Sequence, residues 1–126
     1  MNITRYFGRL DNEAIHTYAY VWPVDMFNNT HTAFDVESVA AVTTRLRETL
    51  LKIDENQLHN ESENGDVIVL VSHADVLQIM QVYAAGLDNV GMFSSYRFAN
   101  GEIRCMKRNV NSLPEPQPLQ PPKPGT

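Results

Sequence analysis

The clearest pattern along the chain is an apolar run that turns at once into a helical period. Residues 67–71 read Val-Ile-Val-Leu-Val without polar alternation, which is typical of a strand covered on both faces of a sheet. Apolar residues then recur at helical spacing from Val76 onward. The pattern predicts a strand over residues 66–72 and a helix over residues 75–85, with His73 at the junction between them.

A longer helix is predicted over residues 35–57. Its apolar positions are spaced three, four, four and three residues apart and form one stripe: Val39, Val42, Leu46, Leu50 and Ile53. Asp35 is expected to cap this helix through its carboxylate. Upstream, a short helix is expected around residues 13–21, where Pro23 would end it.

Two strand-like segments, residues 94–98 and 102–106, flank the sequence Ala-Asn-Gly. Asn-Gly between such segments is a strong signal for a β-hairpin. A long helix, a buried strand, a second helix and a hairpin together predict an α/β domain.

The end of the chain has a different composition. Six of the seven prolines lie within residues 114–124, and such a segment cannot build a core. We therefore expect a folded domain over residues 1–108 and a disordered, proline-rich tail over residues 109–126. The proline spacing in the tail would suit an SH3 or WW domain as partner.

Composition limits the possible functions. The 126 residues are 43% hydrophobic, which suits one small soluble domain. The net charge of −5 gives no basic surface for nucleic acid, and no apolar run approaches the ~20 residues that span a membrane. Cys105 is the single cysteine and the amino terminus does not read as a signal peptide, so a cytoplasmic protein is expected.

The candidate chemistry centres on His73. In open α/β sheets, ligands bind at the carboxyl ends of the strands, where helix amino ends attract phosphate or carboxylate groups. Ala74 is small enough to let a ligand approach the backbone. A histidine at this position is also typical of a residue that merely caps a strand or helix. The other three histidines lack metal-ligand spacing, so neither a metal nor a cofactor is expected.

Taken in order, these residues resemble the carboxyl half of the histidine phosphatase superfamily, also called the phosphoglycerate mutase-like family. The resemblance covers about residues 4–107. It is carried by three segments. These are RYFGRLDN at residues 5–12 with Val21-Trp22 and Asp25 further on, Glu37-Ser38 with Val42 and Arg45, and VLVSHADVLQIM at residues 69–80.

The resemblance implies a mixed sheet flanked by helices, incomplete at its amino end. It also implies metal-free hydrolysis or transfer of a phosphoryl group through phosphohistidine, with a phosphorylated small molecule or phosphate as ligand. His73 matches the family's second histidine and is the expected catalytic residue. Arg5, His73 and Ala74 are the expected phosphate-binding residues. Thr4 stands where the family has its acid, and a hydroxyl cannot replace a general acid near neutral pH.

One family feature is absent from the sequence. The family's nucleophile lies in an amino-terminal R-H-G motif, and none of the four histidines has this context. We therefore expect a truncated product or an inactive remnant, with little or no phosphatase activity. The R-H-G strand of the family lies beside the strand of the second histidine. Strand 66–72 would thus lack a ladder partner, unless the hairpin or another chain supplies one. The rival function is a non-catalytic module that binds an anion or, through its tail, a protein.

Overall fold

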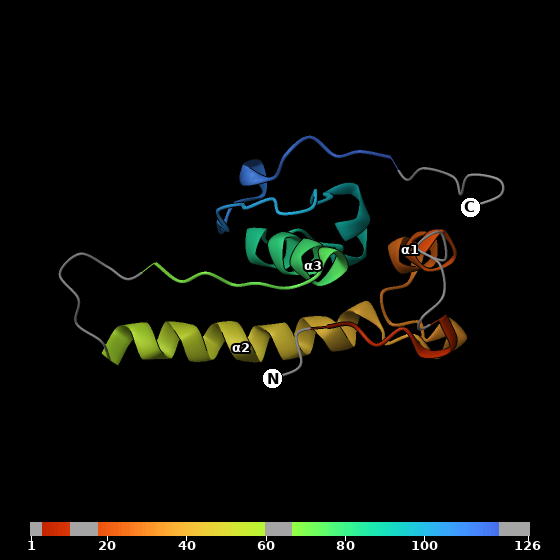
Figure 1. The fold of residues 1–126 in the computed structure, drawn as a ribbon, viewed down its shortest axis with the longest axis horizontal. Coiled ribbons are helices and arrows are strands. Elements are labelled where there is room, and N and C mark those ends of the chain that lie inside the picture. Colours follow the sequence, from red (N-terminus) through yellow and green to blue (C-terminus); the bar gives the residue numbers. More distant parts are fainter. Residues whose placement is uncertain (1–3, 11–17, 60–66, 119–126) are drawn as a thin grey trace.

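The computed structural model describes residues 4–10, 18–59 and 67–118 (Figure 1). Its helices are α1 (Tyr18–Phe27), α2 (Val39–His59) and α3 (Ala74–Ala85), with short 3₁₀ helices at Gly8–Leu10 (η1), Ala33–Asp35 (η3), Val90–Ser95 (η4) and Val110–Ser112 (η5). Helix α2 is the longest element, and its carboxyl-terminal half extends past α3 (Figure 1).

Helix α3 confirms the helix that the periodicity predicts. It begins at Ala74, one residue earlier than expected, and ends at Ala85, with Gly86 as its C-cap residue. Gly86 adopts a left-handed conformation with a φ of 82°, and its N–H donates to the carbonyls of Val82 and Tyr83. A residue with a side chain would be strained in this conformation, which explains why the helix ends at a glycine.

Helix α2 buries Val39, Val42 and Leu46 of the predicted stripe and leaves Leu50 and Ile53 half-buried. It begins at Val39 rather than at residue 35. The predicted Asp35 cap is wrong, because Phe34 and Asp35 have φ values of 57° and 58° within η3 and turn the chain before the helix. Ser38 acts at this end instead, since its Oγ accepts the N–H of Ala41 at 3.1 Å.

Helix α1 continues through Pro23 to Phe27, so the prediction that Pro23 ends a helix here is wrong. A proline inside a helix costs about 3 kcal/mol because it removes one backbone hydrogen bond. Val21 and Asp25 lie on either side of Pro23 and are fully buried. We attribute the persistence of the helix to these tertiary contacts. Residues 13–17 of the predicted helix lie outside the described residues.

The core lies where α2, α3 and η4 meet. Its buried apolar residues are Val39, Val42, Leu46, Val76, Ile79, Met80, Val82 and Phe93. The ring of Phe93 is fully buried and meets the indole of Trp22 edge-on, with 5.7 Å between centroids and 78° between planes. Because burial of each such side chain contributes about 1.5–3 kcal/mol, this cluster fixes α3 and η4 against α2. A smaller cluster of Phe7, Val21 and Val36 joins α1 to the amino-terminal segment.

The predicted mixed sheet is wrong for the part of the chain that is described, because no strand occurs in it. The described part of the predicted buried strand, residues 67–72, is extended and leads into the start of α3 (Figure 1). Asp66 lies outside the described residues. No hydrogen bond joins the backbone of residues 67–71 to any described residue. A strand is defined by its ladder, and no segment within the described ranges provides one for these residues.

The predicted hairpin is also wrong, although its turn forms. Gly101 has a φ of 71°, and the N–H of Glu102 donates to the carbonyl of Ala99 at 3.1 Å. Ser94 and Ser95, however, belong to η4 instead of a strand. Residues 113–118 run along η4 without regular structure, and the N–H of Gln117 donates to the carbonyl of Ser95 at 2.8 Å. The rest of the predicted tail, residues 119–126, lies outside the described residues.

Candidate functional site

His73 and Ala74 lie exposed at the amino end of α3. His73 is the N-cap residue, with extended backbone angles of −95° and 165°, and its ring makes no hydrogen bond within the described part of the chain. Its carbonyl accepts the N–H of Leu77 and so begins the helix. The N–H of Ala74 has no acceptor among the described residues. An unbonded amide beside an exposed imidazole, at a positive helix end, suits an anionic ligand.

Asp75 turns inward from the same turn and is buried. Its Oδ1 accepts the N–H of Val76 at 3.0 Å, whereas its Oδ2 has no hydrogen-bond partner among the described groups. Burial raises the pKa of Asp75 above its ordinary value, and the positive charge of Arg5 partly opposes this shift. Arg5 is therefore close enough to the first turn of α3 to act on it electrostatically.

Arg5 forms a buried ion pair with Asp25. Its Nη1 and Nη2 donate to Oδ2 and Oδ1 of Asp25, each at 2.9 Å, and its Nε donates to the carbonyl of Glu37 at 2.8 Å. Neither side chain of the pair has exposed surface. The guanidinium lies near the rings of Phe7 and Phe93, 5.4 Å and 5.9 Å from their centroids. This bidentate arrangement fixes the guanidinium in position.

His31 adds a hydrogen bond to Asp25, and its second hydrogen bond shows which ring nitrogen carries the proton. Its Nδ1 accepts the N–H of Ala33 at 3.0 Å, so the ring proton of the neutral imidazole lies on Nε2. That Nε2–H donates to Oδ1 of Asp25 at 2.6 Å. The Asp25 carboxylate thus accepts hydrogen bonds from two side chains, which compensates for its burial. Sequence reasoning assigned no role to Asp25 or His31, and only the position of Asp25 inside a family-like stretch could have indicated one.

The Glu37 and Arg45 of the family-like motif act as a clamp on the amino-terminal segment. Arg45 donates through Nε to Oε1 of Glu37 at 2.9 Å and through Nη2 to Oε2 at 2.8 Å. Nη2 also donates to the carbonyl of Thr4 at 2.9 Å, and Oε2 of Glu37 accepts the N–H of Tyr6 at 3.1 Å. The clamp therefore fixes the residues on both sides of Arg5, including the position where the family has its acid.

The structure brings two of the three predicted site residues to one place and sets the third apart. His73 and Ala74 share the exposed amino end of α3, whereas Arg5 lies in the interior with its fork occupied by Asp25. Asp75 relates the two regions, because it follows His73 by two residues and its pKa is lowered by the positive charge of Arg5. The arrangement provides an exposed imidazole at the start of α3 and, in the interior, a fixed cation that is paired with Asp25.

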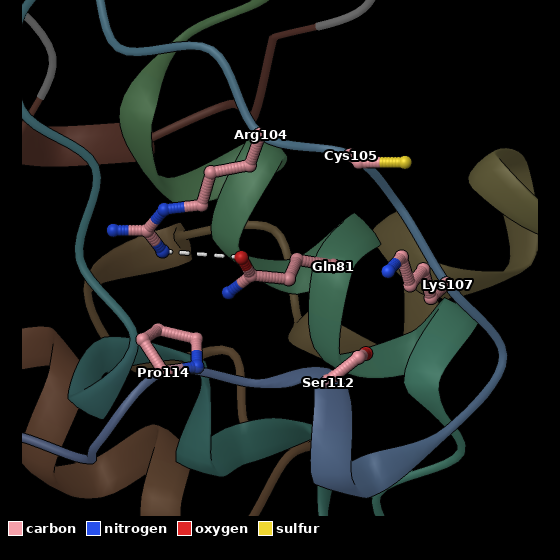
Figure 2. Close-up of a pocket in the computed structure, with 6 residues that line it drawn as sticks. All are labelled: Gln81, Arg104, Cys105, Lys107, Ser112 and Pro114. Carbon is pink, nitrogen blue, oxygen red and sulfur yellow. Dashed lines mark hydrogen bonds between the residues drawn. The ribbon is translucent and has the colours of Figure 1, made fainter.

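A cavity of about 330 Å³ lies elsewhere, between α3 and the segment that follows the Asn-Gly turn. It is lined by Gln81, Arg104, Cys105, Lys107, Ser112 and Pro114 (Figure 2). The Nε, Nη1 and Nη2 of Arg104 already donate to protein acceptors, including Gln81 Oε1 at 3.1 Å, and its guanidinium lies over Phe98. Cys105 points away from Gln81 (Figure 2). Gln81 is about 12 Å along the helix axis from His73, so the cavity is separate from the candidate site.

Two further findings concern the described residues only. No group of three or more histidine, cysteine, aspartate or glutamate side chains there is arranged to hold a metal ion. No helix within these ranges combines the length and the apolar character that crossing a membrane requires.

Comparison with known proteins tests the resemblance directly. The family model described as histidine phosphatase superfamily (branch 1) matches residues 1–112. Neither a curated protein nor a solved structure gives a significant match. The matched range includes the Glu37–Arg45 clamp, the Arg5 segment and the His73 junction, which confirms the resemblance inferred from the sequence. With most of its length covered by this match, the chain belongs to the histidine phosphatase superfamily.

Proposed function

We propose that the chain binds the phosphate of a phosphorylated small molecule at the amino end of α3. The observation that carries the proposal is the exposed imidazole of His73 beside the N–H of Ala74, neither of which bonds to a described residue. The helix dipole adds positive potential at this point. The superfamily assignment supports phosphatase or mutase-like chemistry as the origin of the site.

Each predicted residue has a defined part in this proposal. A ring N–H of His73 donates a hydrogen bond to a phosphate oxygen, and the N–H of Ala74 donates a second one. Direct binding of phosphate by Arg5 stays a prediction. It requires the Arg5–Asp25 pair to separate, because that carboxylate occupies both ends of the guanidinium fork.

Turnover requires more than these groups. In the superfamily a histidine nucleophile attacks phosphorus while an acid protonates the leaving oxygen. These 126 residues contain no R-H-G motif, and Thr4 stands at the position of the acid. We therefore expect binding without hydrolysis or phosphoryl transfer, so that the chain acts as an anion-binding module. Interaction of the proline-rich tail with an SH3 or WW domain remains the alternative function.

Phosphate titration followed by NMR tests the binding. We expect saturable shifts at the His73 ring and the Ala74 amide, and we expect their loss in His73→Ala. Arg108→Ala is the matched control for general attraction to surface cations, because Arg108 is exposed and pairs only with Asp54 among the described residues. Unsaturable shifts, or shifts equally reduced by both variants, would contradict the proposal.

Hydrolysis of p-nitrophenyl phosphate by the same samples tests the expected lack of turnover. We expect no rate above background for the wild type or for His73→Ala. A clear rate in the wild type that His73→Ala abolishes would show that the chain is an active phosphatase with a nucleophile outside the R-H-G pattern.

A further inference from the structure

Three side-chain N–H groups converge on one carboxylate in the interior. Nη1 and Nη2 of Arg5 and Nε2 of His31 donate to the oxygens of Asp25, at 2.9, 2.9 and 2.6 Å. The Arg5 and Asp25 side chains have no exposed surface, and the His31 side chain is 8% exposed. A guanidinium fork and an imidazole N–H placed around two oxygens are the donors that bind a phosphate or carboxylate ligand. Here the oxygens belong to the chain itself.

Both donor side chains are also held by groups other than Asp25. Nε of Arg5 donates to the carbonyl of Glu37 at 2.8 Å. Nδ1 of His31 accepts the N–H of Ala33 at 3.0 Å. Because neither contact involves the carboxylate, the donors should keep their positions when the carboxylate leaves. Such preorganisation lowers the free-energy cost of binding an anion in its place.

The carboxylate comes from a different element than its donors. Arg5 lies in the amino-terminal segment and His31 follows α1, whereas Asp25 lies in the last turn of α1. Pro23 is inside this helix and has no N–H, so the backbone of α1 lacks one hydrogen bond just before Asp25. Phe27, at the end of the helix, is 91% exposed. The turn that carries the carboxylate can therefore move with less loss of backbone hydrogen bonding than the same turn of an uninterrupted helix.

We infer that Arg5 and His31 form a second anion site, which Asp25 occupies as an internal ligand and so keeps closed to oxyanions. For its effect on phosphate the inference rests on the proposed function. Arg5 acts electrostatically on Asp75 in the first turn of α3, the turn that holds the proposed phosphate site. While Asp25 compensates the guanidinium, little of that positive charge reaches a phosphate at His73. Loss of the Asp25 charge should therefore strengthen phosphate binding there.

Rescue by formate tests the second anion site by itself. Asp25→Ala removes the carboxylate and leaves room for a formate ion, whose two oxygens can accept the same hydrogen bonds. We expect sodium formate to raise the Tm of this variant saturably, and by more than sodium chloride at equal ionic strength. Asp35→Ala is the matched control, because it makes the same change of charge but releases only the exposed Arg9. Its response to the two salts should be the same.

The outcome is decisive even when Asp25→Ala is unfolded in plain buffer. Formate should then restore the far-UV circular dichroism of the folded chain, and chloride should not. A variant that gains no more from formate than from chloride would overturn the inference. So would an equal gain from formate in Asp35→Ala, since that result shows a general effect of the salt.

Phosphate titration followed by NMR tests the effect on the proposed phosphate site. We expect the Kd reported by the His73 ring to be about tenfold lower in Asp25→Asn than in Asp35→Asn. Equal Kd values in the two variants would overturn the claim that Asp25 weakens phosphate binding. Absence of His73 shifts in the wild type and in both variants would contradict the proposed function instead. The formate experiment would still decide whether Arg5 and His31 accept an anion.

Discussion

Arg5 and Asp25 form two parallel hydrogen bonds of 2.9 Å, and both side chains are completely buried. The pair joins the amino-terminal segment to α1, and His31 adds a third hydrogen bond to the same carboxylate. Removing one member of a buried pair is costly because it leaves the other charge without compensation.

The first prediction is that Asp25→Asn lowers the free energy of unfolding by about 3–5 kcal/mol. Asparagine keeps the shape of the side chain but removes the negative charge that compensates Arg5. The loss of unfolding free energy therefore measures the cost of a buried guanidinium without a counter-charge. Urea denaturation of the two proteins measures the difference. The exposed pair Arg9–Asp35, 70% and 72% exposed, gives the control. Asp35→Asn should change stability by less than about 1 kcal/mol, and equal losses at both sites would contradict the argument.

The second prediction concerns the clamp formed by Glu37 and Arg45. Glu37→Gln removes the charge that holds Arg45 and weakens the acceptor for the N–H of Tyr6. Because the pair is partly exposed, we expect a loss of only about 1 kcal/mol. The sharper readout is hydrogen exchange, which should become faster at the Tyr6 amide and stay unchanged at the Leu77 amide of α3. Unchanged exchange at Tyr6 would show that the clamp does not fix this segment.

Local signals in the sequence were sufficient for α3 and for the body of α2, but not for the start of α2 or for the continuation of α1 through Pro23. The apolar spacing predicts the buried stripe of α2, and the period after residue 75 with Gly86 predicts α3, because each signal lies within the element that it describes. The sheet could not be predicted in the same way. Residues 67–71 have the composition of a strand, but a strand also needs a partner from elsewhere, and the segment itself carries no information about whether one is present.

The candidate site shows the same division. The sequence places His73 at the start of a helix, and the structure agrees. It identifies Arg5 as a family-like cation without showing that its fork is occupied by a carboxylate 20 residues away. His31 gave no signal, because its relation to Asp25 depends on how the chain turns between α1 and η3. Residue types thus indicated the possible chemistry, whereas tertiary contacts determined which groups remain free.

The third prediction follows from the raised pKa of Asp75. Burial is the main cause, while Arg5 lowers the pKa and Asp25 raises it further. Between the ordinary value of 3.8 and the raised native value, the folded protein binds more protons than the unfolded chain. The free energy of unfolding therefore falls as the pH rises through this window and stays lowered above it. Asp75→Asn removes this dependence.

Denaturation curves of the wild type and Asp75→Asn across the pH range measure this effect. The stability of the variant relative to the wild type should rise with pH through the window and become constant above it. Because the test uses how the difference in unfolding free energy changes with pH, any pH-independent effect of the asparagine side chain cancels. A difference that is flat with pH, or one that falls as the pH rises, would contradict burial as the main influence on this carboxyl.

The last prediction separates close packing from backbone strain at two glycines. Gly8 and Gly86 both have positive φ values, 54° and 82°, so alanine is strained at either position. A Cβ at Gly8 would lie 2.3 Å from the carbonyl oxygen of Asp35, whereas at Gly86 it would meet nothing within 4 Å. Gly8→Ala must therefore displace the backbone of η3. We expect it to lose about 1–3 kcal/mol more than Gly86→Ala in urea denaturation. Equal losses would mean that the segments around Gly8 and Asp35 do not approach this closely, and the register that brings Arg5 to Asp25 would then be wrong as well.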